Sequence, residues 1–176
     1  AGMPTAAVGH LQGIDIATHI TYHFRETWRP QSMKITPHQV IEAIVSAGVQ
    51  KWVLMGLYGY VGYLSQPRAT QDVDVLVDRL ERDAAVAAIL KRWPMLEVRD
   101  SPIVVRFVDP GETHGGQEPQ VVIDIMLPND DCQLSILSDC VVVDPDTGHR
   151  IPTLEAAMAA KYSAIVSPYR EWIRKQ

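Results

Sequence analysis

Long hydrophobic runs are missing from this sequence of 176 residues. No apolar stretch approaches the roughly 20 residues that a helix needs to cross a membrane, so we expect no membrane-spanning segment. Cysteine is also scarce: Cys132 and Cys140 are the only two, and their spacing matches neither zinc ligands nor a redox motif. A chain without an expected disulfide framework is typical of a reducing compartment, and we therefore predict a cytoplasmic protein.

Positive charge is in deficit as well. The chain has 16 Lys and Arg residues against 21 Asp and Glu residues, which gives a net charge of −5. This balance argues against a protein that coats nucleic acid, although it leaves room for a local basic patch. With 47% hydrophobic and 21% charged residues, the composition is that of an ordinary globular protein with one core.

A domain boundary is predicted near Met33, where the segment MKITPHQ looks like a natural protein start. Residues 1–32 are the hardest part of the chain to interpret, and we expect them to be an extension outside the core fold. Residues 33–176 then form a single domain, because their length suits one hydrophobic core.

Two helices are predicted from their capping residues. Thr36 followed by Gln39 forms a capping box, in which each side chain accepts a hydrogen bond from the other residue's backbone. Asp78 and Glu81 repeat this spacing in front of a second predicted helix, residues 79–93. Both helices carry apolar residues three and four positions apart, which predicts that one side of each packs against a core.

Short apolar segments are the predicted strands: residues 51–55, 72–77, 95–99, 103–108 and 120–127. Before the last of them lies a polar segment, DPGETHGGQEP, residues 109–119. It contains Asp109, Glu112 and His114, but its proline and glycine content favours a flexible turn over a catalytic cluster.

Asp72 and Asp74 lie on one predicted strand, separated by Val73. Because alternate side chains of a strand point to the same face, both carboxylates project to one side, with Cα atoms roughly 6.5–7 Å apart. Two carboxylates side by side repel each other, which a divalent cation or a raised pKa of one of them relieves. This pair is therefore a candidate metal site.

Asp124 is the single charged residue in the apolar run VVIDIML. An ionised carboxylate is costly to bury without a partner, so either a neighbouring cation or a set of core hydrogen bonds must accompany it. If its strand joins the same sheet as Asp72 and Asp74, three carboxylates converge. Three such groups can hold two magnesium ions, which in two-metal sites activate an attacking hydroxyl and stabilise the phosphoryl charge.

The segment between the first two predicted strands begins with Gly56 and is poor in charge. Glycine lets a backbone approach a ligand closely, and a following helix directs free N–H groups at an anion. Packing of small residues against the sheet also explains the glycines, and their spacing alone favours packing. Arg68 and Thr70 lie in the next loop, where Arg68 either clamps a phosphate or pairs with a nearby aspartate.

The run from residue 52 to 78 resembles the nucleotidyltransferase superfamily of the polymerase beta type, specifically its small bacterial abortive-infection-like and minimal members. The family pattern is a strand, a Gly-Gly or Gly-Ser pair that opens a helix, a spacer often reading Pro-Arg-Ala-Thr, and Asp-x-Asp on the next strand. Here the pair is Gly56-Leu57, the spacer is residues 67–70, and the acids are Asp72 and Asp74.

Two further matches extend the resemblance over about residues 52–166. Asp124 corresponds to the third acid of the family, which lies on a later apolar strand. The segment IPTLEAAMAAKYSA is similar to the helix that presents a lysine to the triphosphate, which gives that role to Lys161, with Thr153 as the helix N-cap. The resemblance implies an α+β fold, a mixed β-sheet flanked by helices.

The resemblance also implies a reaction: an acceptor hydroxyl attacks the α-phosphorus of a nucleoside triphosphate, and pyrophosphate leaves. Asp72, Asp74 and Asp124 would be the catalytic residues and the ligands of two Mg²⁺ ions. The nucleotide would be bound by Gly56, Leu57, Arg68, Thr70 and Lys161. The acceptor stays open between an RNA end such as that of a tRNA, a protein hydroxyl and a small molecule.

Two departures from the family pattern support an alternative. Leu57 stands where the family usually has glycine or serine, and the family commonly continues with another helix and another acid beyond Tyr169-Arg170-Glu171-Trp172. The Lys161 helix would then either lack its usual support or be completed by a partner chain. A protein partner or a homodimer is therefore expected. The alternative function is a catalytically degenerate nucleotide- or partner-binding module of the toxin–antitoxin type. A metal-dependent phosphodiester hydrolase is a third candidate, which the basic residues disfavour.

Overall fold

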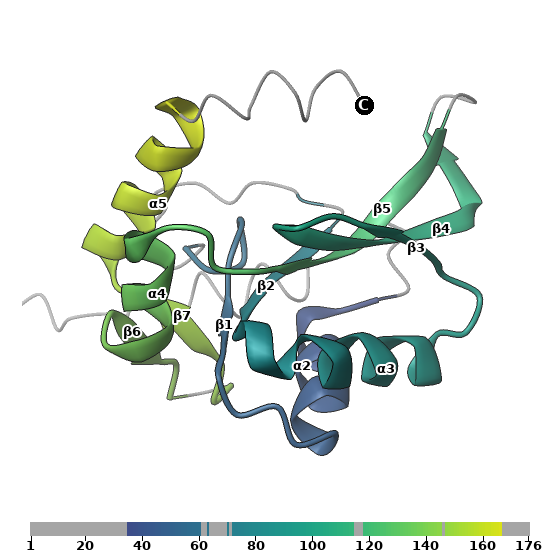
Figure 1. Cartoon of the computed structure of the whole chain (residues 1–176), viewed down its shortest axis with the longest axis horizontal. Coiled ribbons are helices and arrows are strands. Elements are labelled where there is room, and N and C mark those ends of the chain that lie inside the picture. Colours follow the sequence, from purple (N-terminus) through teal and green to yellow (C-terminus); the bar gives the residue numbers. More distant parts are fainter. Residues whose placement is uncertain are drawn as a thin grey trace, which may run out of the picture.

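A computed structural model of the chain is shown in Figure 1, and the structure describes residues 35–60, 63, 70, 72–114, 118–145 and 147–166. Five strands form one sheet in the order β1-β2-β5-β4-β3. They are β1 (Trp52–Leu54), β2 (Val73–Val77), β3 (Glu97–Asp100), β4 (Val104–His114) and β5 (Glu118–Met126). β2 and β5 run parallel, whereas the other neighbouring pairs are antiparallel. This mixed sheet flanked by helices confirms the predicted α+β fold.

Helices α2 (Pro37–Ser46) and α3 (Arg82–Arg92) cover one face of the sheet (Figure 1). Alternate residues of the strands point at them and build the main core, because successive side chains of a strand face opposite ways. Val75 of β2, Ile125 of β5 and Phe107 of β4 belong to this core, and each is fully buried. The residues between them therefore lie on the other face of the sheet.

A second, smaller core lies at the β1 end of the sheet. It is built against α4 (Asp131–Ser138) and α5 (Leu154–Val166), with a hairpin of β6 (Val141–Val143) and β7 (Arg150–Pro152) beside them. Leu76 reaches this cluster from β2, and Met126 packs against it from β5. Helices α4 and α5 thus cover only the β1–β2 part of the face that α2 and α3 leave free (Figure 1).

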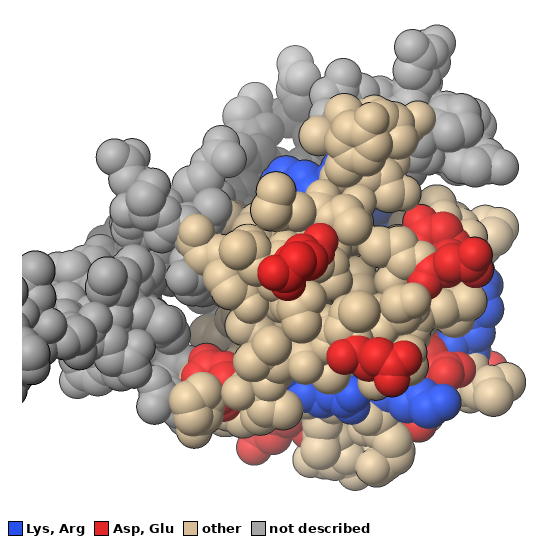
Figure 2. Space-filling view, turned by 90° about the vertical axis from the view of Figure 1, so that its left-hand side faces the viewer, with Lys and Arg blue, Asp and Glu red and all other residues tan. Residues whose placement is uncertain are grey.

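The outer surface of α4, α5 and β6 is poor in charge and rich in exposed apolar side chains. Figure 2 views the molecule from this side and shows mainly uncharged residues, with acidic side chains set apart from one another. The exposed apolar residues here are Leu134, Val142, Val143, Leu154, Met158, Tyr162, Ile165 and Val166. Exposed apolar side chains gathered on one side of a molecule are typical of a protein–protein contact.

The predicted N-caps of three helices are found in the structure, whereas the predicted capping role of Glu81 is not. Thr36 and Gln39 form the predicted capping box of α2, and Thr153 accepts a hydrogen bond from the Ala156 N–H at the start of α5. Asp78 caps a short 3-10 helix, Arg79–Glu81, that leads into α3. The second predicted capping box is wrong.

The Glu81 carboxylate does not reach back to Asp78. It instead accepts hydrogen bonds from the backbone N–H groups of Gln50 and Lys51, at 2.8–3.1 Å. These two N–H groups lie just before β1, where the ladder with β2 has not yet begun. Asp78 already caps the helix terminus, so the Glu81 carboxylate is free to accept hydrogen bonds from these two N–H groups, which have no partner in the ladder.

The polar segment 109–119 was predicted as a flexible turn, and this prediction is wrong for most of its length. β4 continues to His114 and β5 begins at Glu118, so the segment is the tip of a long hairpin. The ladder is irregular here, with register shifts between Phe107 and Val108 and between Asp109 and Thr113. Bulged hairpins tolerate Pro and Gly that would disrupt a regular central strand.

Two other expectations fall wholly or partly outside the residues that the structure describes. Residues 1–32 are not among the described residues, so their place relative to the core stays a prediction. After Gly56, a helix was expected; the described residues 56–60 form a hydrogen-bonded turn, with the Gly59 N–H donating to the Met55 carbonyl at 2.9 Å. Among the described residues, no helix combines the length and apolar character needed to cross a membrane.

Candidate active site

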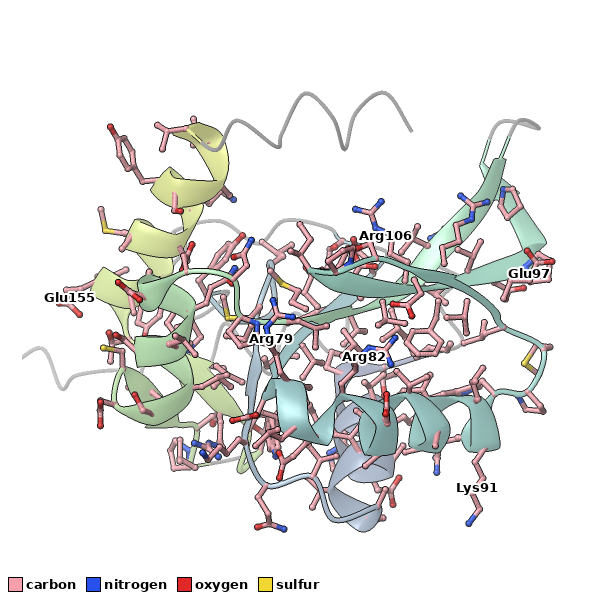
Figure 3. All side chains as sticks on the ribbon, viewed as in Figure 1. Arg79, Arg82, Lys91, Glu97, Arg106 and Glu155 are labelled. Atoms are coloured by element: carbon pink, nitrogen blue, oxygen red, sulfur yellow. The ribbon has the colours of Figure 1, made fainter. Side chains whose placement is uncertain are left out.

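Four charged residues form a row across the sheet, on the face opposite α2 and α3. The register places Asp74 of β2 directly beside Asp124 of β5, and Asp124 directly beside Arg106 of β4. Arg106 in turn is opposite Arg99 of β3. Figure 3 shows Arg106 on the side of the sheet away from α3. Two carboxylates and two guanidinium groups thus lie on neighbouring strands in the order acid, acid, base, base.

Asp72 lies at the entrance to β2, one residue before the strand begins. The Thr70 hydroxyl donates a hydrogen bond to Asp72 Oδ1. Asp72 also acts electrostatically on Tyr58, whose pKa is raised to about 12 by burial and then by the negative charge of this carboxylate. Thr70 and Asp72 are therefore next to each other, beside the turn that holds Tyr58.

The carboxylates influence one another strongly. The pKa of Asp74 is raised to about 7, mainly by burial and then by the nearby charges of Asp72 and Asp124, against the opposing effect of Arg106. The pKa of Asp124 is raised to about 6, mainly by burial; Arg106 opposes this rise and Asp72 adds to it. A positive charge placed among these groups would relieve both the burial and the repulsion.

Asp124 uses its two oxygens differently. Oδ2 is 3.5 Å from Arg106 Nε, which makes an ion pair. Neither this Nε nor Asp124 Oδ1 has a hydrogen-bond partner among the described residues. The Asp124 side chain is 15% exposed. A buried carboxylate oxygen without a partner costs on the order of 1–3 kcal/mol, which makes Oδ1 a candidate ligand atom for a cation.

The carboxylate oxygens of the three acids are the donor atoms that a metal ion would use. Within the described part of the chain, no three His, Cys, Asp or Glu side chains are gathered closely enough to hold one ion as they stand. Thr70 holds one oxygen of Asp72, and Arg106 faces one oxygen of Asp124. Carboxylate oxygens are nevertheless the ligands that Mg²⁺ prefers, and the unpartnered Asp124 Oδ1 and the raised pKa of Asp74 fit a site for a cation.

Gly56 lies against the carboxylate of Asp74. Its φ is +57°, and a Cβ atom at this position would be 1.8 Å from Asp74 Oδ2. The neighbouring Met55 N–H donates to the Asp74 carbonyl at 2.8 Å. Gly56 is thus needed both for its backbone conformation and for the space of the carboxylate. Leu57, the departure from the family pattern, follows in the same turn and is half-buried.

Lys161 of α5 reaches the same turn. Its Nζ donates a hydrogen bond to the Tyr60 hydroxyl at 3.0 Å and lies 4.9 Å from the centre of the Tyr60 ring. The Tyr63 hydroxyl ties the segment to β7 by donating to the Pro152 carbonyl at 3.2 Å. Lys161, Thr70 and Gly56 thus all lie around one turn, while Arg68 lies outside the described residues.

Arg106 is a site residue that the sequence analysis missed. The segment IVVRFV carries one charged residue in an apolar strand, as VVIDIML does, and this shared pattern would have indicated Arg106 as a partner for Asp124. The contact of Tyr60 with Lys161 could not be predicted from the sequence, because it depends on how α5 packs.

No protein-family model matches the chain, and no curated protein matches its sequence. Among solved structures, it is similar to a candidate nucleotidyltransferase from H. pylori, with 18% identity over 76% of this chain and 59% of that one, and a TM-score of 0.44. The Helicobacter pylori protein JHP933 gives 19% identity, 73% and 56% coverage, and a TM-score of 0.43.

A third similar structure is an antigenic nucleotidyltransferase-like protein from Paracoccidioides brasiliensis, with 14% identity, 91% and 72% coverage, and a TM-score of 0.43. The chain therefore spans less than two thirds of the two H. pylori proteins. Two of the three names belong to the class that the sequence motifs resemble. Since all three TM-scores are below 0.5, the site's own residues must support any function.

Proposed function

We propose that the protein is a metal-dependent nucleotidyltransferase, which moves a nucleoside monophosphate from a nucleoside triphosphate to an acceptor hydroxyl. The observation that supports it best is the pairing of Asp74 with Asp124 on adjacent strands, with Asp72 close enough to raise the pKa of both. Carboxylates forced together on a sheet face are costly for the fold alone and are typical of sites that bind metal and phosphate.

Asp72, Asp74 and Asp124 would hold the metal ions, which we take to be Mg²⁺. When bound, the metal supplies positive charge that neutralises the phosphates and makes the acceptor hydroxyl easier to deprotonate. The residues around the metal ions would place the acceptor in line with the bond to the leaving pyrophosphate. Asp124, which lies beside Asp74 on the adjacent strand, would accept the hydroxyl proton.

The triphosphate would lie along the turn that follows β1. Its support comes from Lys161, whose ammonium group is held at this turn by Tyr60, and from the Thr70 hydroxyl beside Asp72. Backbone N–H groups near Gly56 and Leu57 and the guanidinium of Arg68 would add to it. The acceptor is an RNA end, a protein hydroxyl or a small molecule, in the cytoplasm.

The test is a calorimetric titration of each nucleoside triphosphate into the protein, with and without Mg²⁺, followed by transfer of α-³²P label to a pool of tRNA, protein and aminoglycoside acceptors. We expect Mg²⁺-dependent binding that the double variant Asp72→Ala/Asp74→Ala loses. Asp78→Ala is the matched control, because Asp78 follows the same strand but caps the next helix. A folded wild type that binds no triphosphate would contradict the proposal.

The second candidate function, a partner-binding module of the toxin–antitoxin type, is favoured by a different observation. The outer side of α5 exposes Met158 (65%) and Tyr162 (68%), and further apolar residues continue this surface onto α4 and β6. A protein partner or a second copy would cover it. Partner binding that persists in Asp72→Ala/Asp74→Ala, in a protein without triphosphate affinity, would favour the module over the enzyme.

A further inference from the structure

Arg106 lies in β4 between two residues of the main core. Val105 and Phe107 are fully buried and point toward α2 and α3, so Arg106 points to the face that carries Asp74 and Asp124. Its side chain is 33% exposed, and its ion pair is with Asp124. A partly buried ion pair is weak evidence for stability, because desolvation of the two charges offsets their attraction, so the pairing calls for another explanation.

The contact between Arg106 and Asp124 is one-sided. Arg106 Nε faces Asp124 Oδ2 at 3.5 Å, while Oδ1 stays buried without a hydrogen bond among the described residues. Because the two residues are direct neighbours across strands, the backbone fixes the separation of their Cβ atoms at about 5 Å. In this arrangement Oδ2 faces the guanidinium and Oδ1 is turned away from it.

We propose that Arg106 is a positioning residue of the active site, which holds Asp124 by one oxygen so that the other is presented to the metal ion and the reacting hydroxyl. This proposal rests on the proposed nucleotidyltransferase function. Arg106 acts through Asp124 and is not assigned any contact with substrate. Its partner on the outer side, Arg99, is exposed and forms no ion pair with the described residues, so it does not share this role.

The charge of Arg106 and its effect on the orientation of Asp124 should act differently on cation binding and on the rate of the chemical step, which makes the proposal testable. The positive charge of Arg106 repels a cation, so removing it should leave cation binding unchanged or stronger once all three acids are ionised. Removing the guanidinium also frees the Asp124 carboxylate to rotate, which should slow the chemical step. A residue that only stabilised the fold would lower both properties together with the melting temperature.

The experiment compares the full-length wild type with Arg106→Gln, Arg106→Lys and Arg99→Gln, at a pH well above 7. Three quantities are measured: the melting temperature, the Kd for Mn²⁺ by calorimetry without nucleotide, and kcat and KM for label transfer to the acceptor pool. Arg99→Gln is the matched control, since it removes the same group one strand further from the acids.

For Arg106→Gln we expect kcat to fall about 10- to 100-fold, with the Kd for Mn²⁺ no weaker than that of the wild type and KM for the triphosphate unchanged within about two-fold. Arg106→Lys should recover part of kcat, and Arg99→Gln should match the wild type. A kcat for Arg106→Gln within about two-fold of wild type, or a loss that parallels weaker Mn²⁺ binding, would overturn the role of Arg106 alone. A wild type that neither binds Mn²⁺ nor transfers label would overturn the proposed function, and the role of Arg106 with it.

Discussion

The backbone of Gly56 and the carboxylate of Asp74 occupy adjoining space, so close that a Cβ atom at position 56 would lie 1.8 Å from Asp74 Oδ2. Gly56 lies in the turn that follows β1 and Asp74 lies on β2, and the Met55 N–H donates to the Asp74 carbonyl between them. The turn and the acid are therefore built as one unit, and neither can change without moving the other.

Gly56→Ala should be much more damaging than Gly148→Ala. Both glycines have a positive φ, +57° and +67°, but a Cβ atom at Gly148 would have no neighbour within 4 Å. The strained backbone alone should cost each variant roughly 1–2 kcal/mol. Gly56→Ala should lose more than that in thermal unfolding, and should also lose Mn²⁺ binding because Asp74 is displaced. Equal unfolding free energies for the two variants would contradict the close contact.

The stability of the protein in the presence of a chelator should fall as pH rises through about 7. The pKa of Asp74 is about 7 in the folded state against 3.8 for an ordinary aspartate, so the folded protein binds this proton more tightly than the unfolded chain. The contribution is therefore complete below about pH 4 and is lost above pH 7. Asp72, Asp124 and Arg106 are the charged groups that act on Asp74, and Asp124 adds a similar loss near pH 6.

Asp74→Asn removes this ionisation and isolates the effect. At about pH 8 without metal, it should raise the free energy of unfolding by on the order of 4 kcal/mol, and it should flatten the pH dependence of stability between about pH 4 and 7. Urea unfolding at a series of pH values measures both. A variant less stable than the wild type at pH 8 would contradict this prediction.

Asp78→Ala should lower the stability of the protein but leave its triphosphate binding unchanged. Asp78 Oδ1 accepts a hydrogen bond from the Leu80 N–H at 2.9 Å, and Oδ2 lies 3.6 Å from Lys51 Nζ. Loss of this cap should cost about 1 kcal/mol of stability. Triphosphate binding should stay at the wild-type level, since Asp78 takes no part in the carboxylate row. Calorimetry and thermal unfolding on the same sample give both values.

Lys161→Met should weaken triphosphate binding about ten-fold, because a charge-assisted contact with phosphate is lost. Tyr60→Phe is the informative companion. It removes the hydroxyl that accepts the Lys161 hydrogen bond but keeps the ring under the ammonium group, so we expect binding to change by about two-fold at most. Titrations of both variants test it; an unaltered affinity in Lys161→Met would exclude Lys161 from the nucleotide site.

Much of the local structure follows from neighbouring residues in the sequence. The capping box of Thr36 and Gln39 is complete within four residues, so the sequence contains everything that decides it. The strand that carries Asp74 was predictable for the same reason, since its apolar pattern is local. Helix α4 and the β6–β7 hairpin were not predicted, because elements as short as these depend on the surface they pack against.

The Asp72-Val73-Asp74 motif and the isolated Asp124 were visible in the sequence, and they suggested a metal site before any fold was known. What joins them is the parallel pairing of β2 with β5, which connects segments far apart in the chain. Sheet register depends on the whole core, because a shift of one residue would turn Asp124 toward α2 and α3. The sequence therefore determined which acids are candidates, whereas only the tertiary structure decided that Asp74 lies beside Asp124 and that Arg106 faces one of its oxygens.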